Sequence, residues 1–221
     1  MADHADPFGA HRDDLVAFAR RLAGDDLAYG TSGNLSVRAG DLMAITPSGV
    51  PYDVMAPSGI CLVRVADGSV TAGHRPSTET PMHLAVYRAT GAGAIVHTHS
   101  PFVVALSSVL DELPAVHYAM ASLGGPVRVA PYARFGTGGL AESALTALAD
   151  RTAVILANHG ALAYGSTLAQ AYERAGVLEW LARVYWHARM LGTPRTLDAA
   201  ALAEVAGAAR ALRYGEPDPL P

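Results

Sequence analysis

The chain has 221 residues, of which 51% are hydrophobic and 16% charged, and its formal net charge is −4. This balance allows one sizeable folded core and excludes a disordered chain, while the scattered positive charges provide no basic stripe for nucleic acid or an anionic membrane. All 16 basic residues are arginine, which excludes Schiff-base aldolases, pyridoxal-phosphate enzymes and P-loop nucleotide hydrolases, because each of these needs a lysine.

Helices and strands are predicted to alternate from one end of the chain to the other. In chain order, apolar periodicity and turn residues predict a helix at 13–27, strands at 35–38, 42–46 and 60–65, a helix at 80–90, a strand at 94–99, a helix at 101–109, a strand at 127–130, a helix at 138–149, a strand at 153–157, and helices at 168–190 and 198–213. This interleaving favours a single layered domain that mixes the two kinds of element.

The cellular compartment is indicated by what the chain lacks. Cys61 is the single cysteine, so it cannot form an internal disulfide or anchor a multi-cysteine metal site, and this fits a reducing cytosol. No secretory pattern is visible, and no apolar stretch approaches the ~18–20 residues of a membrane span. We therefore expect a cytoplasmic protein with no membrane span.

Three of the nine histidines stand at the ends of predicted strands. His97 and His99 are two residues apart on one strand, so both side chains point to the same face and can reach one ion. His159 follows the strand at 153–157. A His-x-His pair alone is equally typical of ordinary surface or core histidines, but a third histidine at another strand end favours a metal site. Three imidazoles with an open fourth position are typical of catalytic zinc.

Glu79 stands where the helix at 80–90 begins. A carboxylate there complements the helix dipole, which would suffice to explain it, but a metal site also needs a proton carrier, and Glu79 is the candidate. His83 lies one helical turn later on the same face. A hydrogen-bonded structural role is favoured for His83 over a role behind the metal ligands.

Short polar turns suggest an anion site that needs no lysine. Residues 30–34 and 46–49 are built of Gly, Ser, Thr, Asn and Pro, and Ser77 and Thr78 open the helix that carries Glu79. Backbone N–H groups, hydroxyls and a helix N-terminus can together hold a phosphate. Each segment by itself is typical of an ordinary turn, whereas their joint presence with three candidate ligands favours phosphate binding.

These features occur together in one known family. The segments that carry the resemblance are 30–38, 45–52, 76–79, 94–99, 114–118, 131–137 and 158–160. With these seven motifs in the family's order, the chain resembles the class II aldolase and epimerase family, which includes the adducin head domain. The resemblance implies an α/β fold, a three-layer α/β/α single domain over 1–221 on a mostly antiparallel central sheet. It also implies a four-fold cyclic homotetramer with active sites at the subunit interfaces.

The resemblance also assigns roles to residues of this chain. It implies that His97, His99 and His159 hold one Zn²⁺ or another divalent ion per subunit, and that Glu79 is the acid/base group and can also bind the metal. Tyr118 would reach a neighbouring subunit's site and protonate an aldehyde oxygen. The implied phosphate-binding residues are Thr31, Gly33, Asn34, Ser48, Gly49, Ser77 and Thr78. Tyr214 resembles the family's tail tyrosine, and from about residue 214 the resemblance implies a mobile tail, whose Pro-rich end departs from the family pattern.

The implied activity is zinc-dependent cleavage of a ketose 1-phosphate, of the L-fuculose 1-phosphate type, to dihydroxyacetone phosphate and an aldehyde such as L-lactaldehyde. Members that act as methylthioribulose-phosphate dehydratases or sugar-acid-phosphate decarboxylases share the metal and phosphate sites. Ribulose-phosphate 4-epimerases typically carry aspartate where Glu79 stands, which counts against that activity. A non-enzymatic adducin-like interaction domain is disfavoured because such domains lose the metal ligands.

Overall fold

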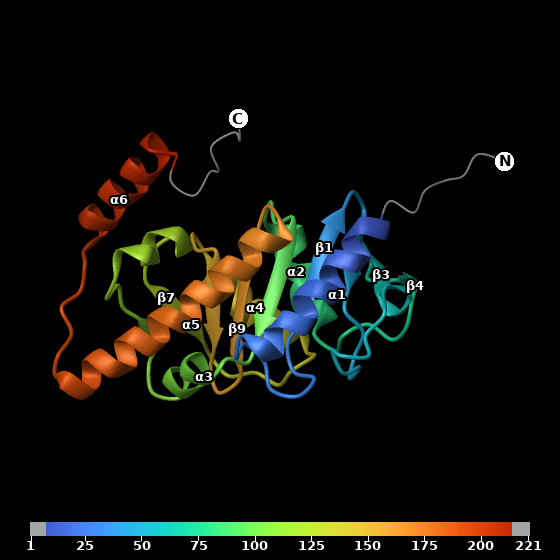
Figure 1. The fold of residues 1–221 in the computed structure, drawn as a ribbon, viewed down its shortest axis with the longest axis horizontal. Coiled ribbons are helices and arrows are strands. Elements are labelled where there is room, and N and C mark those ends of the chain that lie inside the picture. Colours follow the sequence, from blue (N-terminus) through green and yellow to red (C-terminus); the bar gives the residue numbers. More distant parts are fainter. Residues whose placement is uncertain (1–7, 214–221) are drawn as a thin grey trace.

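The computed structural model describes residues 8–213, which form one central sheet with helices on both faces (Figure 1). The helices are α1 (Gly9–Gly24), α2 (Thr80–Ala89), α3 (Pro101–Ser107), α4 (Gly138–Leu148), α5 (Leu168–Leu191) and α6 (Ala199–Ala211), with 3-10 turns η1 (Pro57–Gly59) and η2 (Tyr118–Leu123). The strands are β1 (Asn34–Ala39), β2 (Leu42–Ile45), β3 (Cys61–Arg64), β4 (Val70–Ala72), β5 (Ala94–Thr98), β6 (Glu112–Leu113), β7 (Val127–Ala130), β8 (Ala153–Leu156) and β9 (Gly160–Gly165).

The sheet has the strand order β4-β3-β2-β1-β5-β9-β8-β7-β6. Every neighbouring pair is antiparallel except β7 and β8. The prediction of a mostly antiparallel central sheet is therefore confirmed. Strands β5 and β9 lie in the middle of the sheet, and each is hydrogen-bonded to a neighbouring strand on both sides. The end of β5 is therefore a rigid place for functional side chains.

Two separate hydrophobic cores make the fold three-layered. Alternate residues of a strand point to opposite faces, and on β5 Val96 belongs to one core and Ile95 to the other. The first core includes residues of α1, α3 and α5, and the second includes residues of α2 and α4. In Figure 1, α1 and α5 lie across the front of the sheet and α2 and α4 lie behind it. The predicted α/β/α arrangement is confirmed.

The sequence-based boundaries differ from the structure at several points. The first helix spans Gly9–Gly24, whereas residues 13–27 were predicted, because Asp26 takes a positive φ of 55° that a helix cannot accommodate. The central strand β9 was not predicted, nor were the short β4 and β6. The sequence of β9, Gly-Ala-Leu-Ala-Tyr-Gly, is poor in β-branched residues, and burial from both faces makes it a strand.

Two further predictions concern membrane spans and the C-terminal tail. None of the helices within residues 8–213 is long and apolar enough to cross a membrane. Tyr214 and the predicted mobile tail lie outside the described residues.

Candidate active site

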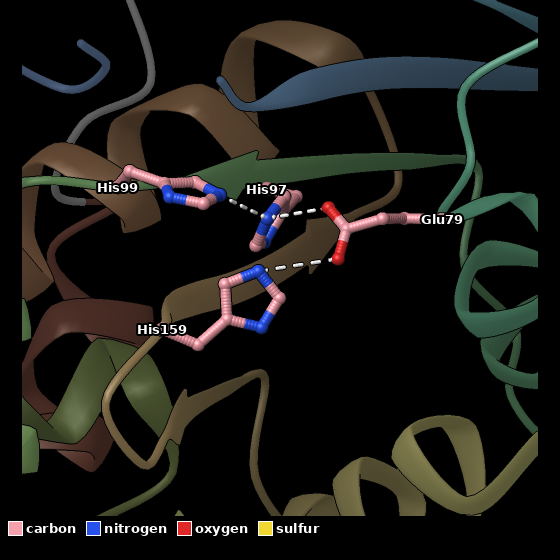
Figure 2. Close-up of side chains that lie close together, drawn as sticks. All are labelled: Glu79, His97, His99 and His159. Carbon is pink, nitrogen blue, oxygen red and sulfur yellow. Dashed lines mark hydrogen bonds and ion pairs between the residues drawn. The ribbon is translucent and has the colours of Figure 1, made fainter. Parts of the chain in front are cut away.

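Four side chains that are far apart in the sequence meet at one end of the central strands. Glu79, His97, His99 and His159 each offer one ligand atom, and these atoms all lie within 4.8 Å of one another. Figure 2 shows the three imidazoles and the carboxylate turned toward one another. His97 Nε2 lies 2.7 Å from Glu79 Oε2 and 2.9 Å from His99 Nε2. This donor set can hold a metal ion.

The sheet fixes the orientation of His97. His97 is fully buried on β5, and its Nδ1 lies 2.8 Å from the backbone oxygen of Ala161 on the neighbouring strand β9. A carbonyl oxygen only accepts, so Nδ1 carries the hydrogen and Nε2 of the neutral ring presents its lone pair to the cluster. A hydrogen bond of this kind is the usual support of a metal-binding histidine. His97 is therefore oriented as a ligand by the backbone of a strand 64 residues away.

His99 and His159 are held by turns at the ends of β5 and β8. The backbone N–H of His99 donates to the carbonyl of Leu27 at 2.9 Å. His159 lies in the tight turn between β8 and β9, where Asn158 has a φ of 54°. The next residue, Gly160, approaches β5 so closely that an added Cβ would lie 2.0 Å from the Thr98 oxygen. A glycine at 160 thus lets the turn bring His159 over the end of β5.

Glu79 is buried with only 5% of its surface exposed, at the residue that precedes α2. Its Oε2 accepts from the Asn34 amide at 3.1 Å. Its Oε1 lies 3.2 Å from His159 Nε2 but without hydrogen-bond geometry, and has no hydrogen-bond partner among the described residues. A buried carboxylate oxygen without such a partner, beside three imidazoles, fits a site built for a cation.

Charge within the cluster shifts the ionisation of its members. Burial disfavours the ionised form of Glu79, but the close imidazoles of His97 and His159, which carry positive charge when protonated, outweigh it and hold the pKa of Glu79 below its usual range. Burial, with like charge from His97 and His159, lowers the pKa of His99 to about 3. His99 is therefore neutral at physiological pH and has a lone pair free for a metal.

All seven residues predicted for phosphate binding line the same cavity as Glu79, His99 and His159. The cavity has a volume of about 280 Å³. Its lining residues are Thr31, Ser32, Gly33, Asn34, Pro47, Ser48, Gly49, Ser77, Thr78, Glu79, His99, Tyr132, Ala133, Phe135, Asn158 and His159. Ser32, Tyr132, Ala133, Phe135 and Asn158 were given no role from the sequence, although each lies in one of the seven motifs.

The polar turns of the cavity are locked by backbone contacts. Gly33 has a φ of 84°, and an added Cβ would lie 2.9 Å from the backbone oxygen of His97, so this turn rests directly on the strand that carries His97. Pro47 forms an isolated bridge with Pro76, and Ser77 Oγ accepts from the backbone N–H of Glu79 at 3.2 Å. The predicted phosphate turns and the predicted metal ligands therefore form one connected site.

Tyr118 does not line this cavity. It begins η2, with 51% of its surface exposed, and its ring lies against that of His117 with 4.2 Å between centroids. Within one chain, the Tyr118 hydroxyl, predicted to protonate an aldehyde oxygen, therefore lies outside the cavity of that chain.

His83 is a buried structural histidine. It is fully buried, its Nδ1 lies 2.7 Å from Ser36 Oγ, and burial lowers its pKa to about 3. The structure places it against β1, outside the four-residue cluster, as the hydrogen-bonded interpretation predicts.

Comparison with known proteins assigns the fold and the chemistry. The family described as "Class II Aldolase and Adducin N-terminal domain" matches residues 13–186. The chain belongs to this family. Among solved structures, an L-fuculose 1-phosphate aldolase superposes with a TM-score of 0.89 at 36% identity, covering 95% of this chain and 100% of that chain.

Several relatives of this class II aldolase are named for their substrates. A 5-deoxy-D-ribulose 1-phosphate aldolase of Bacillus thuringiensis serovar kurstaki is 40% identical over 190 residues, covering 84% of this chain and 89% of the relative. A 5-methylthioribulose-1-phosphate/5-deoxyribulose-1-phosphate aldolase of Rhodospirillum rubrum is 39% identical and covers 86% of each chain. An L-fuculose phosphate aldolase of Escherichia coli K12 is 40% identical over 161 residues, covering 72% of this chain and 74% of the relative. The chain is thus an enzyme of the aldehyde-lyase class.

Proposed function

We propose that this enzyme cleaves a 5-deoxypentulose 1-phosphate, such as 5-deoxy-D-ribulose 1-phosphate, to dihydroxyacetone phosphate and acetaldehyde. The observation that carries the proposal is one cavity lined by His99, His159, the buried Glu79 and the Ser/Thr/Gly turns, with His97 completing the ligand cluster beside it. The substrate class is supported by relatives of that activity, which align with 84% and 86% of the chain. L-fuculose 1-phosphate, which would yield L-lactaldehyde, is the second candidate, supported by a relative that aligns with 72% of the chain and by a solved structure that covers 95% of it.

The proposed reaction breaks the bond between C3 and C4 of the ketose phosphate. The C4 hydroxyl loses its proton as the aldehyde C=O forms, and the electron pair of the broken bond passes to C3. A proton then joins C3 to complete dihydroxyacetone phosphate. No oxidant or further reactant is needed, so the two proton transfers and the stabilisation of negative charge are the tasks of the protein.

His97, His99 and His159 would hold a divalent metal, and an all-imidazole set favours zinc. Such an ion supplies Lewis acidity toward the substrate oxygens that gain negative charge. Glu79 lies 2.7 Å from His97 Nε2 and faces the cavity, where its carboxyl would return the proton to C3 in cleavage and remove it in condensation. Asn34, which donates to Glu79 Oε2 at 3.1 Å, orients that carboxylate.

A neighbouring subunit would complete the site in a four-fold cyclic tetramer. Tyr118, the proposed proton donor to the aldehyde oxygen, is exposed and lies outside the cavity of its own chain. Trp180 and Trp186 of α5 are also partly exposed, at 45% and 39%. Exposed aromatic residues of this kind are typical of subunit interfaces.

The decisive experiment uses the zinc-loaded protein with 5-deoxy-D-ribulose 1-phosphate, 5-methylthio-D-ribulose 1-phosphate and L-fuculose 1-phosphate. Dihydroxyacetone phosphate is measured by coupled reduction to glycerol 3-phosphate, and the second product by mass spectrometry. We expect the highest kcat/KM for the first substrate. Loss of water from the methylthio sugar without carbon–carbon cleavage would establish a dehydratase, and a change of configuration at C4 an epimerase; either result would overturn the proposal.

Sharing of the site between subunits is tested by mixing two inactive variants. Glu79→Gln and Tyr118→Phe are refolded together, so that some sites combine the intact Glu79 of one chain with the intact Tyr118 of its neighbour. Random assembly restores about a quarter of wild-type activity if neighbours share a site. Absence of recovery in a confirmed mixed oligomer would contradict the shared site.

A further inference from the structure

Arg75 is fastened to the rim of the cavity through Ser48. Its guanidinium Nη2 donates to Ser48 Oγ at 3.2 Å, and its backbone oxygen accepts from the Ser48 N–H at 2.9 Å. The bridge between Pro47 and Pro76 lies beside these contacts. The arginine thus connects two of the polar turns that form the cavity, and it is held there by the backbone as well as by its side chain.

The contact determines what the Ser48 hydroxyl can do. A serine hydroxyl has one hydrogen to donate and can also accept. Since Ser48 Oγ already accepts from Arg75, its hydrogen remains available to the cavity that Ser48 lines. Ser77 is in the same condition, because its Oγ accepts from the Glu79 N–H. Two hydroxyls directed as donors suit the oxygens of an anion.

Arg75 also carries a charge that no carboxylate of the described chain pairs with. Within residues 8–213 it forms no ion pair, whereas Arg21 pairs with Asp25 at 3.4 Å. A phosphate oxygen bonded to Ser48 at the usual hydrogen-bond length would lie within about 6 Å of the Arg75 guanidinium. At that separation the positive charge of Arg75 attracts a phosphate, although the water and salt between them partly screen the attraction.

Arg134, which lies next to cavity-lining residues in the chain, is placed differently. Tyr132, Ala133 and Phe135 line the cavity, but Arg134 between them does not. Among residues 8–213, Arg75 is therefore the arginine that donates a hydrogen bond to a cavity-lining side chain.

We propose that Arg75 is the cationic element of substrate recognition: it orients the Ser48 hydroxyl and attracts the phosphate group of the ketose, so that the enzyme selects phosphorylated sugars. The inference rests on the proposed function for the identity of the substrate. The anion site itself stands on the Arg75–Ser48–Ser77 geometry and can be tested without turnover.

The test compares Arg75→Gln, Arg75→Lys and a control, Arg64→Gln. Arg64 is exposed at the far end of β3, opposite Leu42, whereas the cavity lies beyond the Ile45 end of β2. Gln keeps a hydrogen-bond donor without charge, and Lys keeps the charge. All three variants retain the backbone hydrogen bond between residues 48 and 75. A purely structural role of the Arg75 side chain would therefore not follow the charge at this position, which the Lys variant keeps and the Gln variant loses.

Binding of inorganic phosphate to the zinc-loaded protein is measured by calorimetry, and kcat and KM are measured with 5-deoxy-D-ribulose 1-phosphate. We expect Arg75→Gln to raise both the phosphate Kd and the KM about 5- to 20-fold, with a much smaller change in kcat, and to flatten their dependence on salt. Arg75→Lys should restore most of the affinity, and Arg64→Gln should match wild type.

An unchanged phosphate Kd in Arg75→Gln, or a Lys variant as weak as the Gln variant, would overturn the role of the charge. Failure of the proposed function gives a different pattern. Phosphate would still bind in a manner that depends on Arg75, while none of the ketose phosphates would be cleaved.

Discussion

Glu179, in the middle of α5, accepts a hydrogen bond from the backbone N–H of Val103 in the first turn of α3 at 3.0 Å. Its other carboxylate oxygen accepts from Phe102 N–H at 3.1 Å. The side chain is buried with 4% exposure, and burial raises its pKa. Because α3 begins at Pro101, four residues after His97 and two after His99, this buried carboxylate holds the segment that follows two of the proposed metal ligands.

Replacing Glu179 by alanine is expected to lower the free energy of unfolding by about 2–4 kcal/mol, since two backbone donors lose their acceptor and a cavity forms. The metal-free protein is unfolded in urea to measure this, and zinc affinity should fall as well. Glu142→Ala, an exposed glutamate of α4, is the control and should change stability by no more than about 0.5 kcal/mol. Equal effects of the two variants would refute the anchoring role of Glu179.

Removal of one proposed metal ligand tests the metal directly. His97→Ala should abolish both stoichiometric zinc binding and cleavage, because its Nε2 lies at the centre of the cluster and its Nδ1 is held by Ala161. Zinc is measured by atomic emission after dialysis. His11→Gln, on α1 and outside the cluster, should retain full metal content. A metal-free preparation with full activity would eliminate the proposed mechanism.

Glu79→Gln separates proton transfer from metal binding. The amide keeps the size of the carboxylate and leaves the three imidazoles intact, so zinc should be retained. Loss of the proton carrier should reduce kcat by about 10²–10⁴-fold. Stopped-flow cleavage and zinc content are measured on the same sample, and turnover equal to wild type would remove Glu79 from its role.

Gly160→Ala tests the close approach of β9 to β5. A Cβ there would lie 2.0 Å from the Thr98 oxygen, so the two strands must separate next to His97 and His99. We expect a loss of stability above about 2 kcal/mol together with weaker zinc binding. Gly207→Ala in α6, where an added Cβ meets nothing within 4 Å, should instead stabilise by about 0.5–1 kcal/mol. A neutral Gly160→Ala would show that the strands do not pack so closely.

The reactivity of the Cys61 thiol tests whether the hydrophobic core between the sheet and helices α2 and α4 is closed to solvent. Burial raises its pKa from 9.0 to about 11, against the opposing effects of the His74 backbone hydrogen bond and Arg12. At pH 8 about 0.1% is thiolate, so the native protein should react with a disulfide reagent far more slowly than the protein unfolded in guanidinium. Because the pKa of Cys61 is higher in the folded protein than in the unfolded chain, burial of the neutral thiol contributes fully to stability below pH 9. This contribution is lost as the pH rises toward 11. Fast labelling of native protein at pH 8 would contradict this burial.

The chain's local pattern was sufficient for the helices and most strands. Alternation on a strand has a period of two, so His97 and His99 were predicted to share a face from their spacing alone. The polar turns at 30–34 and 46–49 were also recognisable, because glycine and serine favour turn conformations through local backbone geometry and local hydrogen bonds. The motifs that contain these residues then identified the family.

Only the tertiary structure decided which of these pieces meet. His159 reaches the cluster because β9 pairs with β5 and Gly160 permits their contact, and neither pairing nor close approach between residues 62 positions apart leaves a local signal. Ser48 and Arg75 meet for the same kind of reason, 27 residues apart. The sequence by itself determined which residues are candidate metal ligands and where the polar turns lie. Their convergence on one cavity was decided by long-range strand pairing, whose free energy depends on the burial of the whole sheet rather than on any one segment.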